Sequence, residues 1–420
     1  MQKLLGVIFK IVQMTASFFD RTINGHRLGA PEYLGDPYPE YERLLARGSM
    51  IRTYVVGGWS VLGFDAVSAV LTDPRISSDL MKNPTIRRMY RMSSGGDSRI
   101  LKNPLMLSMD PPEHSRLRKL ARGGFLHKFV QSLEPKIRRL TNQCLDRVES
   151  QKQIDLISVL ARPLPAMLIS DLIGVEVSDR DRFRTLAEVF LQNVTVIEFS
   201  ALEKPDKAMG EILDFMENIV EGKRNNLGDD LISLLITADT DGEKLSSREV
   251  TRMCVLLMAA GYETTTRLIG NAVYLLLQNP DQLQDLRSDP KLIPQAVEEV
   301  LRFEPPVQTT TRTATEDMEI LGGHIRKHQT IILVIAAANR DPTANDNPQE
   351  FNIHREKINH IAFGHGIHLC LGAELARLET RIALEVLLER YPIIRLDTGT
   401  PKWEQSYLMR GLDELPLRIS

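Results

Sequence analysis

Cysteine is scarce in this sequence. Its 420 residues include three cysteines, Cys144, Cys254 and Cys370, which lie far apart in the chain. Three widely spaced cysteines, none with a CxxC partner, do not form the paired framework of a small secreted domain. We therefore expect free thiols and a reducing, cytoplasmic compartment.

Long apolar runs and a strong excess of one charge are also missing. No run of about 18 or more apolar residues occurs, so no segment predicts a helix that crosses a bilayer. The 52 basic and 55 acidic residues give a formal net charge of -3, which argues against a nucleic-acid-binding protein. The sequence also has no internal repeat and no linker between domains. We expect one domain over residues 25–420, preceded by an amphipathic segment at 1–24.

The N-terminal segment combines apolar residues with a narrow polar stripe. The stripe recurs every three or four residues, as on one face of a helix, and consists of Lys3, Gly6, Lys10, Gln13, Ser17 and Asp20. A secretory signal is disfavoured because Lys10 interrupts the apolar run and no clear small-x-small cleavage site follows. Residues 3–20 can pack on the body of the protein, lie on a membrane surface or contact a second copy. These alternatives stay open on the sequence, so a cytoplasmic protein with peripheral membrane association is among them.

Helical patterns dominate the rest of the chain, and the β part is minor. The stretches 51–56 and 59–63 flank a Gly-Gly pair and predict a β-hairpin, and short strands are expected within 317–335. Residues 79–102 contain several Pro, Ser and Gly residues and are expected to form a long loop. Further helices are expected at about 113–130, 134–150, 155–173, 178–195, 206–225 and 291–303, with a final helix beginning near Cys370.

The clearest helix begins at Ser246. Ser246 and Glu249 form a capping-box pattern, and apolar residues continue to Leu277 before Asn279 and Pro280 end the pattern. At about 1.5 Å per residue, this helix would be about 48 Å long, which is enough to cross the whole molecule.

Cys370 lies in the stretch FGHGIHLCLGAELARLE, at the predicted start of the final helix. Unpaired amides and the helix dipole favour a thiolate there, which can act as a nucleophile or bind a metal. A zinc site would need three more ligands, and one tight turn does not easily bring His365, His368 and Cys370 around a single ion. A cysteine hydrolase with a base elsewhere in the chain stays open. The other option is a single thiolate that holds a haem iron, with glycines that let the backbone approach the porphyrin.

The ten residues FGHGIHLCLG resemble the haem-binding signature of the cytochrome P-450 family, Phe-Gly-x-Gly-x-His-x-Cys-x-Gly, at every fixed position. The resemblance runs from about residue 35 to the end and is to the soluble bacterial type, from which the apolar N-terminal segment departs. It implies a mainly α fold with a minor β part, a triangular α/β prism with a long central helix over the haem. It also implies haem b as the cofactor, Cys370 as the iron ligand, and haem contacts from Phe363, Gly364, Gly372 and Ala260.

Two further motifs follow the order and spacing of this family. In EEVLRFEPP, Glu299 and Arg302 are spaced i, i+3 and can pair on one helix face. The resemblance implies that this pair is structural and is joined by an arginine or histidine from a later loop. In AAGYETTT, Glu263 and Thr264 resemble the acid–alcohol pair on the distal side of the haem. Gly and Thr disfavour a helix interior, and such a local conflict is expected at a functional site.

The resemblance also implies four basic residues that contact the two haem propionates. His114 and Arg118 stand i, i+4 on one helix face, and Arg and His are suitable donors to a partly buried carboxylate. The implied set is His114, Arg118, Arg312 and His368.

The implied reaction is monooxygenation. Cys370 holds the iron, Glu263 and Thr264 deliver protons during oxygen activation, and one atom of O2 enters a small lipophilic substrate. No flavin- or iron–sulfur-binding segment is visible, so the electrons must come from separate proteins, ferredoxin and ferredoxin reductase or a flavodoxin. We expect such an acidic donor to dock near the Cys370 loop, where basic residues cluster: Arg116, Lys119, Arg122 and Lys128.

The substrate cannot be named from these residues. By their position in the resemblance, the candidates for lining the substrate pocket are Met258, Val307, Gln308, Thr309 and Leu408. Two other activities are alternatives: a haem-thiolate enzyme that uses peroxide or catalyses coupling or isomerisation, and a haem-thiolate sensor without turnover. The intact Glu263–Thr264 pair argues against both, because neither needs this route of proton delivery.

Overall fold

The structure is a computed structural model that describes residues 31–420 apart from 54–57, 95, 123–126, most of 180–202, 229, 241, 398–400 and 405. The predicted amphipathic segment at 1–24 lies outside the described residues, as does most of the helix predicted at 178–195. The helices, short 3-10 and π turns aside, are α2 (Pro31–Leu34), α3 (Tyr38–Leu45), α4 (Phe64–Thr72), α5 (Pro84–Ser93), α6 (Arg99–Lys102), α7 (Glu113–Ala121), α8 (His127–Ser132), α9 (Glu134–Asp146), α10 (Pro163–Ile173), α12 (Glu203–Arg224), α13 (Leu231–Thr237), α14 (Ser247–Gln278), α15 (Pro280–Ser288), α16 (Ile293–Phe303), α17 (Ile335–Asn339) and α18 (Ala373–Arg390). The strands are β1 (Met50–Thr53), β2 (Gly58–Val61), β3 (Ile76–Ser77), β4 (Gln153–Asp155), β5 (Asp239–Thr240), β6 (Glu243–Lys244), β7 (Thr309–Ala314), β8 (Met318–Ile320), β9 (Gly323–Ile325), β10 (Thr330–Val334), β11 (Ile394–Leu396) and β12 (Pro416–Ile419).

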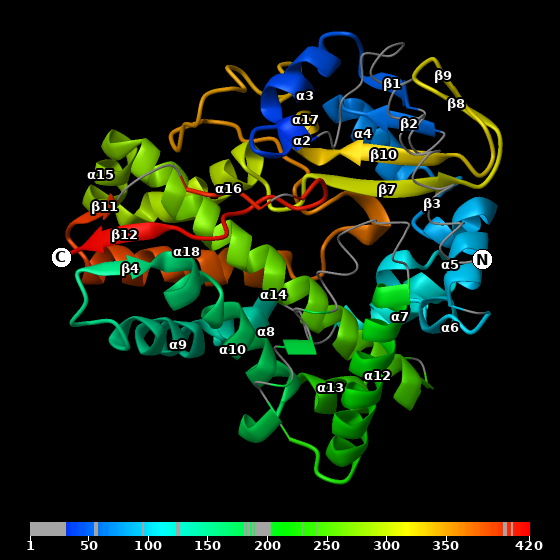
Figure 1. Cartoon of the computed structure of the whole chain (residues 1–420). Coiled ribbons are helices and arrows are strands. Elements are labelled where there is room, and N and C mark those ends of the chain that lie inside the picture. The colour runs from blue at the N-terminus through cyan, green and yellow to red at the C-terminus, as the bar shows by residue number, and fades with distance from the viewer. Residues whose placement is uncertain are drawn as a thin grey trace.

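The main sheet lies at one side of the molecule, beside a larger helical part (Figure 1). Its strand order is β1-β2-β10-β7-β3, in which β2 and β10 are parallel and the other neighbours are antiparallel. The central strand β10 is buried throughout, and apolar after Thr330, because both of its faces are covered. Ile331 and Leu333 pack against α4 on one face, and Ile332 and Val334 pack against α3 on the other. The predicted β-hairpin is confirmed by the pairing of β1 with β2.

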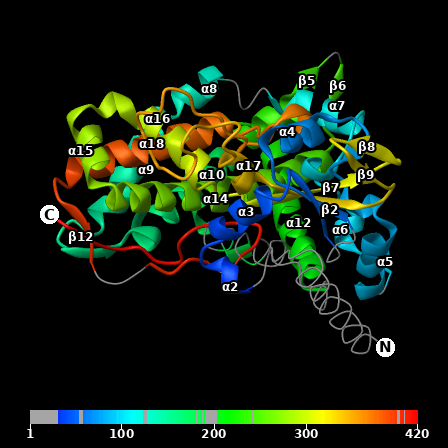
Figure 2. The same cartoon turned by 90° about the horizontal axis from the view of Figure 1, so that it is seen from above.

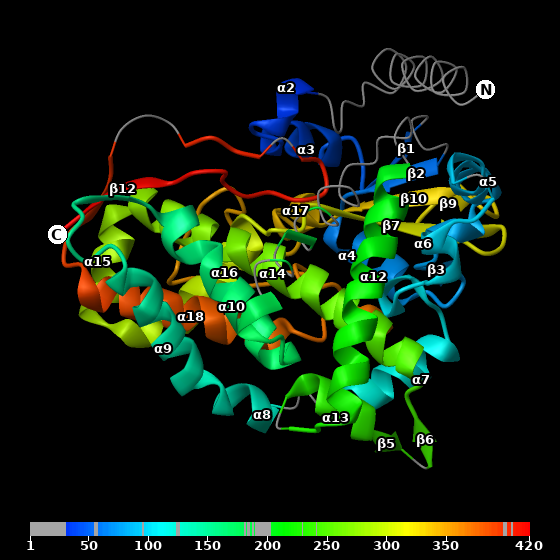
Figure 3. The ribbon, with the colours of Figure 1, turned by 60° about the horizontal axis from the view of Figure 1, so that its bottom comes forward.

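Helix α14 passes through the middle of the helical part and contacts α10, α12, α16 and α18 (Figures 1 and 3). Its start is fixed by the predicted capping box, in which Ser246 and Glu249 each bond to the backbone of the other. It ends at Gln278, before Pro280, and its 32 residues span about 48 Å. The predicted mainly α fold with one long central helix is therefore confirmed. In the part of the chain that the structure describes, no helix is long and apolar enough to cross a membrane.

The loop predicted at 79–102 is wrong, because this segment contains a 3-10 turn and the helices α5 and α6. Asn83 accepts hydrogen bonds from the backbone N–H groups of Thr85 and Ile86, and this cap starts α5 directly before Pro84. Ser98 caps α6 in the same way. Pro84 and Ser98 therefore mark helix starts, whereas Ser93 and Ser94 lie at the end of α5.

Helix α6 is also held by a residue from a distant helix. The carboxylate of Asp206, on α12, accepts hydrogen bonds from the Ser98 hydroxyl at 2.6 Å, from the Arg99 N–H at 3.0 Å and from the Ile100 N–H at 3.1 Å. Figure 3 shows α6 and α12 in the same region of the molecule. Asp206 is buried, so one carboxylate satisfies the N-terminus of α6 and joins it to α12.

Other element boundaries also differ from the prediction. The segment predicted as one helix at 113–130 contains two helices, since α7 ends at Ala121 and α8 begins at His127. Helix α15 and the three-stranded sheet β11-β12-β4 had no sequence signal that we recognised. In that sheet β12, near the C-terminus, pairs with β4, more than 200 residues earlier in the chain, and local patterns do not reveal such a pairing.

Candidate active site

Cys370 lies in a tight loop that leads into α18. Two glycines shape this loop: Gly364 has a φ of 76° and Gly366 a φ of 70°, which side chains rarely adopt. A Cβ at Gly366 would also lie 2.9 Å from the carbonyl oxygen of Leu71. The Cys370 N–H donates to the carbonyl of Phe363 at 2.9 Å and closes the loop. The sequence spacing therefore has a clear geometric reason.

The thiol of Cys370 faces an open space at the N-terminus of a helix. Gly372 is the N-cap residue of α18 and donates its N–H to the thiol. Desolvation by the surrounding protein atoms raises the pKa of the Cys370 thiol, while this N–H and the charges of Arg118 and Arg377 oppose the rise. The side chain is nevertheless exposed, whereas Cys144 and Cys254 are buried. Cys370 is thus the cysteine that is placed to bind a ligand.

Four basic side chains that the sequence singled out lie together beside the Cys370 loop. The rings of His114 and His368 are 4.0 Å apart between centroids, and Arg118 donates to the carbonyl of Leu369 at 2.5 Å. His368 contacts the Ser78 hydroxyl at 2.9 Å through Nε2. The charge of Arg312 acts on His368, which places it in the same group.

The four side chains of this group are all basic, so their positive charges repel one another. Burial lowers the pKa of all four residues, to about 10 for Arg312 and to about 4 for His368, and the pKa of His368 is lowered further by the charges of His114, Arg312 and Arg118. Asp110 opposes the decrease for His114, Arg312 and His368, but it is already bonded to Lys82 and Ser77. The Nδ1 atom of His114 is buried and has no hydrogen-bond partner among the described residues. Such a group would be stabilised by an anionic ligand.

The middle of α14 contains the predicted acid–alcohol pair. Ala260 is exposed although the helix on both sides of it is mostly buried, so this face of α14 also borders an open space. The Thr264 hydroxyl donates to the Ala260 carbonyl at 2.7 Å, one turn back. The helix remains continuous through Gly261 and the threonines. The local conflict seen in the sequence is absorbed without a break.

Glu263 has partners that the sequence did not reveal. Its Oε1 atom accepts a hydrogen bond at 2.8 Å from Arg267, one turn later on α14. Arg267 also donates to Glu404, at 3.1 Å from its Nε atom. Arg267 and Glu404 are 137 residues apart, so their pairing follows from the tertiary fold and has no local pattern.

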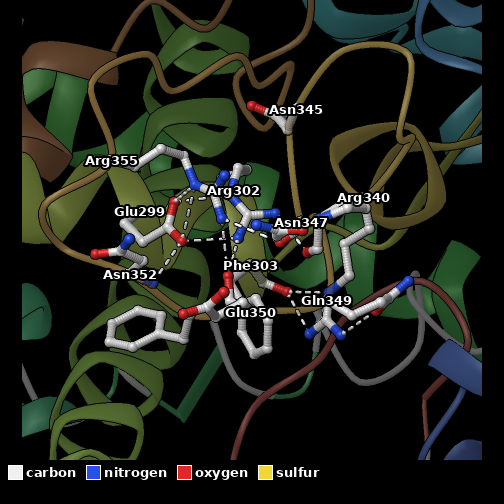
Figure 4. Close-up of polar contacts among 12 residues, drawn as sticks. Glu299, Arg302, Phe303, Arg340, Asn345, Asn347, Gln349, Glu350, Asn352 and Arg355 are labelled. Carbon is white, nitrogen blue, oxygen red and sulfur yellow. Dashed lines mark hydrogen bonds and ion pairs between the residues drawn. The ribbon is translucent and has the colours of Figure 1, made fainter.

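The predicted pair of Glu299 and Arg302 forms a buried ion pair at 2.7 Å, and both side chains are fully buried (Figure 4). Arg355, from the later loop, contacts Glu299 at 3.3 Å, which agrees with the expected third partner. Arg302 also donates to the backbone carbonyls of Pro348 and Glu350. The cluster therefore joins α16 to the loop that precedes Cys370.

A match to a family model decides the classification. The family described as Cytochrome P450 matches residues 60–412, which is most of the chain. The chain belongs to the cytochrome P450 family. It is an enzyme of the monooxygenase class that this family represents, and members bind haem b.

Curated relatives and solved P450 structures agree with this classification. The chain is 41% identical to "Cytochrome P450 107B1" of Saccharopolyspora erythraea over 366 residues, which cover 86% of this chain and 89% of the relative. It is 39% identical to "Cytochrome P450 monooxygenase PikC" of Streptomyces venezuelae, over 92% of each chain. Among solved structures, P450BioI in complex with a hexadec-9Z-enoic acid ligated acyl carrier protein has a TM-score of 0.85 at 35% identity, covering 93% of this chain and 99% of that one.

The residues of this P450 fit a haem group. One exposed thiol would supply a single ligand to the iron, and the described residues hold no group of three or more His, Cys, Asp or Glu side chains that could bind a metal ion. The basic group of four residues beside the thiol has the charge that two propionates require. The thiol and the basic group are both properties of this chain, and together they match the iron and the propionates of one haem.

Sequence reasoning missed a second support of the Cys370 loop. Glu298 accepts hydrogen bonds from Arg377 at 2.6 and 2.9 Å and contacts His360 at 3.0 Å. Burial opposes its ionisation, but these two partners lower the pKa of Glu298 to about 2. The guanidinium of Arg377 also lies 4.5 Å from the ring centre of Phe363. The signal in the sequence was the first glutamate of the EEVLR motif, to which no role was assigned.

Three of the predicted pocket residues are buried by the protein itself. Met258 is fully buried in the core beside α12, and Gln308 and Thr309 are 1% and 3% exposed. Gln308 donates to the carbonyl of Pro305 at 2.8 Å and contacts Tyr41, so it belongs to a structural network. The prediction that these three line a pocket is wrong for this structure, whereas Val307 and Leu408 are half-buried.

Proposed function

We propose that this P450 inserts one oxygen atom of O2 into a lipophilic organic substrate and that Cys370 is its iron ligand. The observation that carries this proposal is the exposed Cys370 thiol at the N-terminus of α18. It receives the Gly372 N–H and lies beside four basic groups, three of which share the single carboxylate of Asp110 among the described residues. A thiolate ligand donates electron density to a haem iron and favours cleavage of the O–O bond.

The four basic residues are assigned to the haem propionates. His114 and His368 lie ring against ring, and Arg118 and Arg312 add two permanent charges to the group. Two bound carboxylates would offset the burial that lowers the pKa of all four residues and the repulsion that lowers the pKa of His114 and His368 further. We assign the remaining haem contacts to Phe363, Gly364 and Gly372 in the Cys370 loop and to Ala260 on α14.

Glu263 and Thr264 are assigned to proton delivery. When bound, haem supplies the activation of O2 and the oxidation of the substrate, and the protein controls the protons. Thr264 is a half-buried hydroxyl that has a single hydrogen bond among the described residues, to the Ala260 carbonyl. A hydroxyl can donate one hydrogen bond and accept others, so Thr264 can pass a proton while it stays oriented by the helix.

The electron donor is assigned to a separate ferredoxin with its reductase, or to a flavodoxin. The expected docking face includes α7, because Arg118 joins this helix to the Cys370 loop. Lys119, Arg122 and Lys128 are exposed at this end of the molecule. Arg116 forms an ion pair with Glu249 of α14 and contributes less positive charge to the surface than the sequence suggested. An acidic donor would be attracted to the remaining cations.

The substrate class is inferred from relatives. Their printed names include "6-deoxyerythronolide B hydroxylase" and "Vitamin D(3) 25-hydroxylase", and a solved neighbour, CYP109E1 from Bacillus megaterium, was crystallised with testosterone. These compounds are large and mainly apolar, so we propose a substrate of the same chemical kind. The hexadec-9Z-enoic acid ligated to acyl carrier protein in the P450BioI complex extends the range to fatty acyl groups.

The test combines a ligand screen with one substitution. Testosterone, vitamin D3 and hexadec-9Z-enoic acid, free or linked to an acyl carrier protein, are added to the haem-loaded protein, and displacement of iron-bound water is read from the haem absorption band. We expect at least one compound to shift the band and to be hydroxylated when ferredoxin and its reductase are supplied. Cys370→Ala should lose the carbon monoxide band that gives the family its name, whereas Cys144→Ala should keep it. Retention of that band by Cys370→Ala would disprove the ligand assignment.

A further inference from the structure

Arg267 is a buried cation that two carboxylates share. Its side chain is 4% exposed, and its Nη2 atom donates to Glu263 Oε1 at 2.8 Å. The Nη1 atom donates to the Glu263 backbone carbonyl at 3.2 Å, and both Nε and Nη2 donate to Glu404 Oε2. A single guanidinium thus connects the middle of α14 to the chain between β11 and β12, which contains Glu404 and is called the C-terminal segment below.

The C-terminal segment is shaped to hold this arrangement. A Cβ at Gly411 would lie 2.3 Å from Cγ of Arg267, so a glycine is needed where the arginine passes. The Glu404 N–H donates to the Gly411 carbonyl at 3.0 Å, and the flanking Trp403 and Leu412 form a β-bridge. Glu404 is therefore fixed over α14 by backbone bonds.

Glu263 is held through one oxygen only. Its Oε2 atom is buried and has no hydrogen-bond partner among the described residues. A buried carboxylate oxygen without a donor is costly, and such atoms are expected where a group must act. Glu263 directly precedes Thr264, the hydroxyl that we assign to proton delivery.

We propose that Arg267 and Glu404 are positioning residues that control the release of Glu263 for proton transfer. This inference rests on the proposed role of Glu263. While Glu404 is ionised, it competes for the donors of Arg267, and Glu263 is free to turn its carboxylate. When Glu404 takes up a proton, Arg267 is left to Glu263 alone and holds it more strongly.

The electrostatics give this control a pH dependence with a definite sign. Burial raises the pKa of Glu404, the charges of Glu263 and Asp413 raise it further, and Arg267 opposes the rise. Protonation of Glu404 on acidification therefore begins at a higher pH than for a solvent-exposed glutamate. Proton delivery should slow as the pH falls through that range and recover above it.

Three substitutions test the proposal in the haem-loaded protein. Glu404→Gln mimics the protonated state, so it should slow product formation about tenfold, raise the solvent deuterium isotope effect and flatten the acid side of the pH profile. Arg267→Gln should raise the hydrogen peroxide formed per NADH severalfold, and Arg267→Lys should restore part of the coupling. Testosterone and hexadec-9Z-enoic acid serve as the probe compounds.

A readout without turnover comes from urea unfolding. Double-mutant cycles should show that the effects of Arg267→Gln are not additive with those of Glu263→Gln or of Glu404→Gln. The matched control is Arg381→Gln, since Arg381 is likewise shared by two carboxylates, Glu134 at 2.7 Å and Glu385 at 2.8 Å. This control should change unfolding but leave the isotope effect and the peroxide yield at the parent values.

Two outcomes would overturn the inference. Additive unfolding effects would mean that the three side chains do not interact as described. Parent-like peroxide yield, isotope effect and pH profile in both Arg267→Gln and Glu404→Gln would mean that the cluster only joins α14 to the C-terminal segment. Failure of the proposed function is recognised separately, because Thr264→Ala would then also remain fully coupled.

Discussion

Two buried clusters of arginine and glutamate in this P450 differ in the balance of their charges. In the first cluster, Glu299 is bound by two arginines, Arg302 and Arg355. In the second, Arg267 is divided between two glutamates, Glu263 and Glu404. The first has an excess of cation and the second an excess of carboxylate, although each joins a helix to a distant loop or strand.

The difference shows how composition separates a fixed cluster from one that can change. In the first cluster Glu299 Oε1 accepts a further hydrogen bond from the Asn352 N–H at 2.9 Å, and the spare donors of Arg302 reach backbone carbonyls (Figure 4). In the second cluster one oxygen of Glu263 stays without a donor among the described residues. Saturated hydrogen bonding favours a single arrangement, whereas competition for one cation permits two.

The comparison predicts the largest loss of stability for a substitution in the first cluster, in which Glu299 is bound by Arg302 and Arg355. Arg302→Ala should lower the free energy of unfolding by about 3–5 kcal/mol, because it leaves Glu299 buried with only one cation. Urea unfolding of the haem-loaded protein measures this loss. Arg381→Ala is the control, and it should cost about 1 kcal/mol or less because this arginine is partly exposed. Equal losses in the two variants would contradict the importance of burial.

Glu379 extends the comparison to a buried carboxyl that forms no ion pair among the described residues. Burial raises the pKa of Glu379 from 4.5 to about 8, so the folded protein keeps a proton that the unfolded chain releases above its own pKa. Stability from this group is therefore present at low pH and is lost as the pH rises toward about 8. Glu379→Gln should gain a few kcal/mol relative to the parent between pH 5 and pH 8. If the free energies of unfolding of Glu379→Gln and the parent differ by the same amount at every pH in that range, Glu379 does not have the raised pKa.

Thr264→Ala tests proton delivery at the residue that follows Glu263 of the second cluster. This variant should bind haem, substrate and O2 and still consume reducing equivalents, because the docking face that we propose for the electron donor does not include Thr264. Product per electron pair should fall about tenfold while hydrogen peroxide accumulates, the usual scale for lost help with proton transfer. Thr265→Ala and Thr266→Ala are controls, since their side chains are buried on other sides of α14. Three variants as coupled as the parent would remove the acid–alcohol role.

The smallest effect is expected at the surface, where two arginines differ in whether they form an ion pair. Arg122 is exposed, whereas Arg116 forms an ion pair with Glu249. Arg122→Glu should therefore slow reduction by ferredoxin severalfold at low ionic strength, and more than Arg116→Glu does. Stopped-flow reduction at two salt concentrations measures both rates. A larger effect of Arg116→Glu would move the docking site toward the start of α14.

Local patterns predicted the parts of these clusters that lie within one helix. The i, i+3 spacing placed Glu299 beside Arg302, and the capping box placed the start of α14 at Ser246. Glycine spacing around Cys370 matched a loop that only residues with positive φ allow. Each of these features depends on neighbours within about seven positions, where local backbone geometry largely decides proximity.

Partners from distant segments could not be predicted in the same way. Glu404 reaches Arg267 across 137 residues, and Glu298 meets Arg377 across 79. The helices at 84–93 and 99–102 were missed for another reason, since Asn83 and Ser98 are typical of both loops and helix caps. Which use prevails depends on tertiary contacts that compete with local preference.

The Asp206 carboxylate on α12 has a consequence for motion. It fills the hydrogen-bonding capacity of the first turn of α6, so α12 and α6 cannot separate without exposing a carboxylate and two amides at once. Losing buried hydrogen bonds to a charged group costs about 1.5–3 kcal/mol each, so such a separation would be rare at equilibrium. Helices α6 and α12 should therefore be displaced as one rigid unit, although more than 100 residues of chain lie between them.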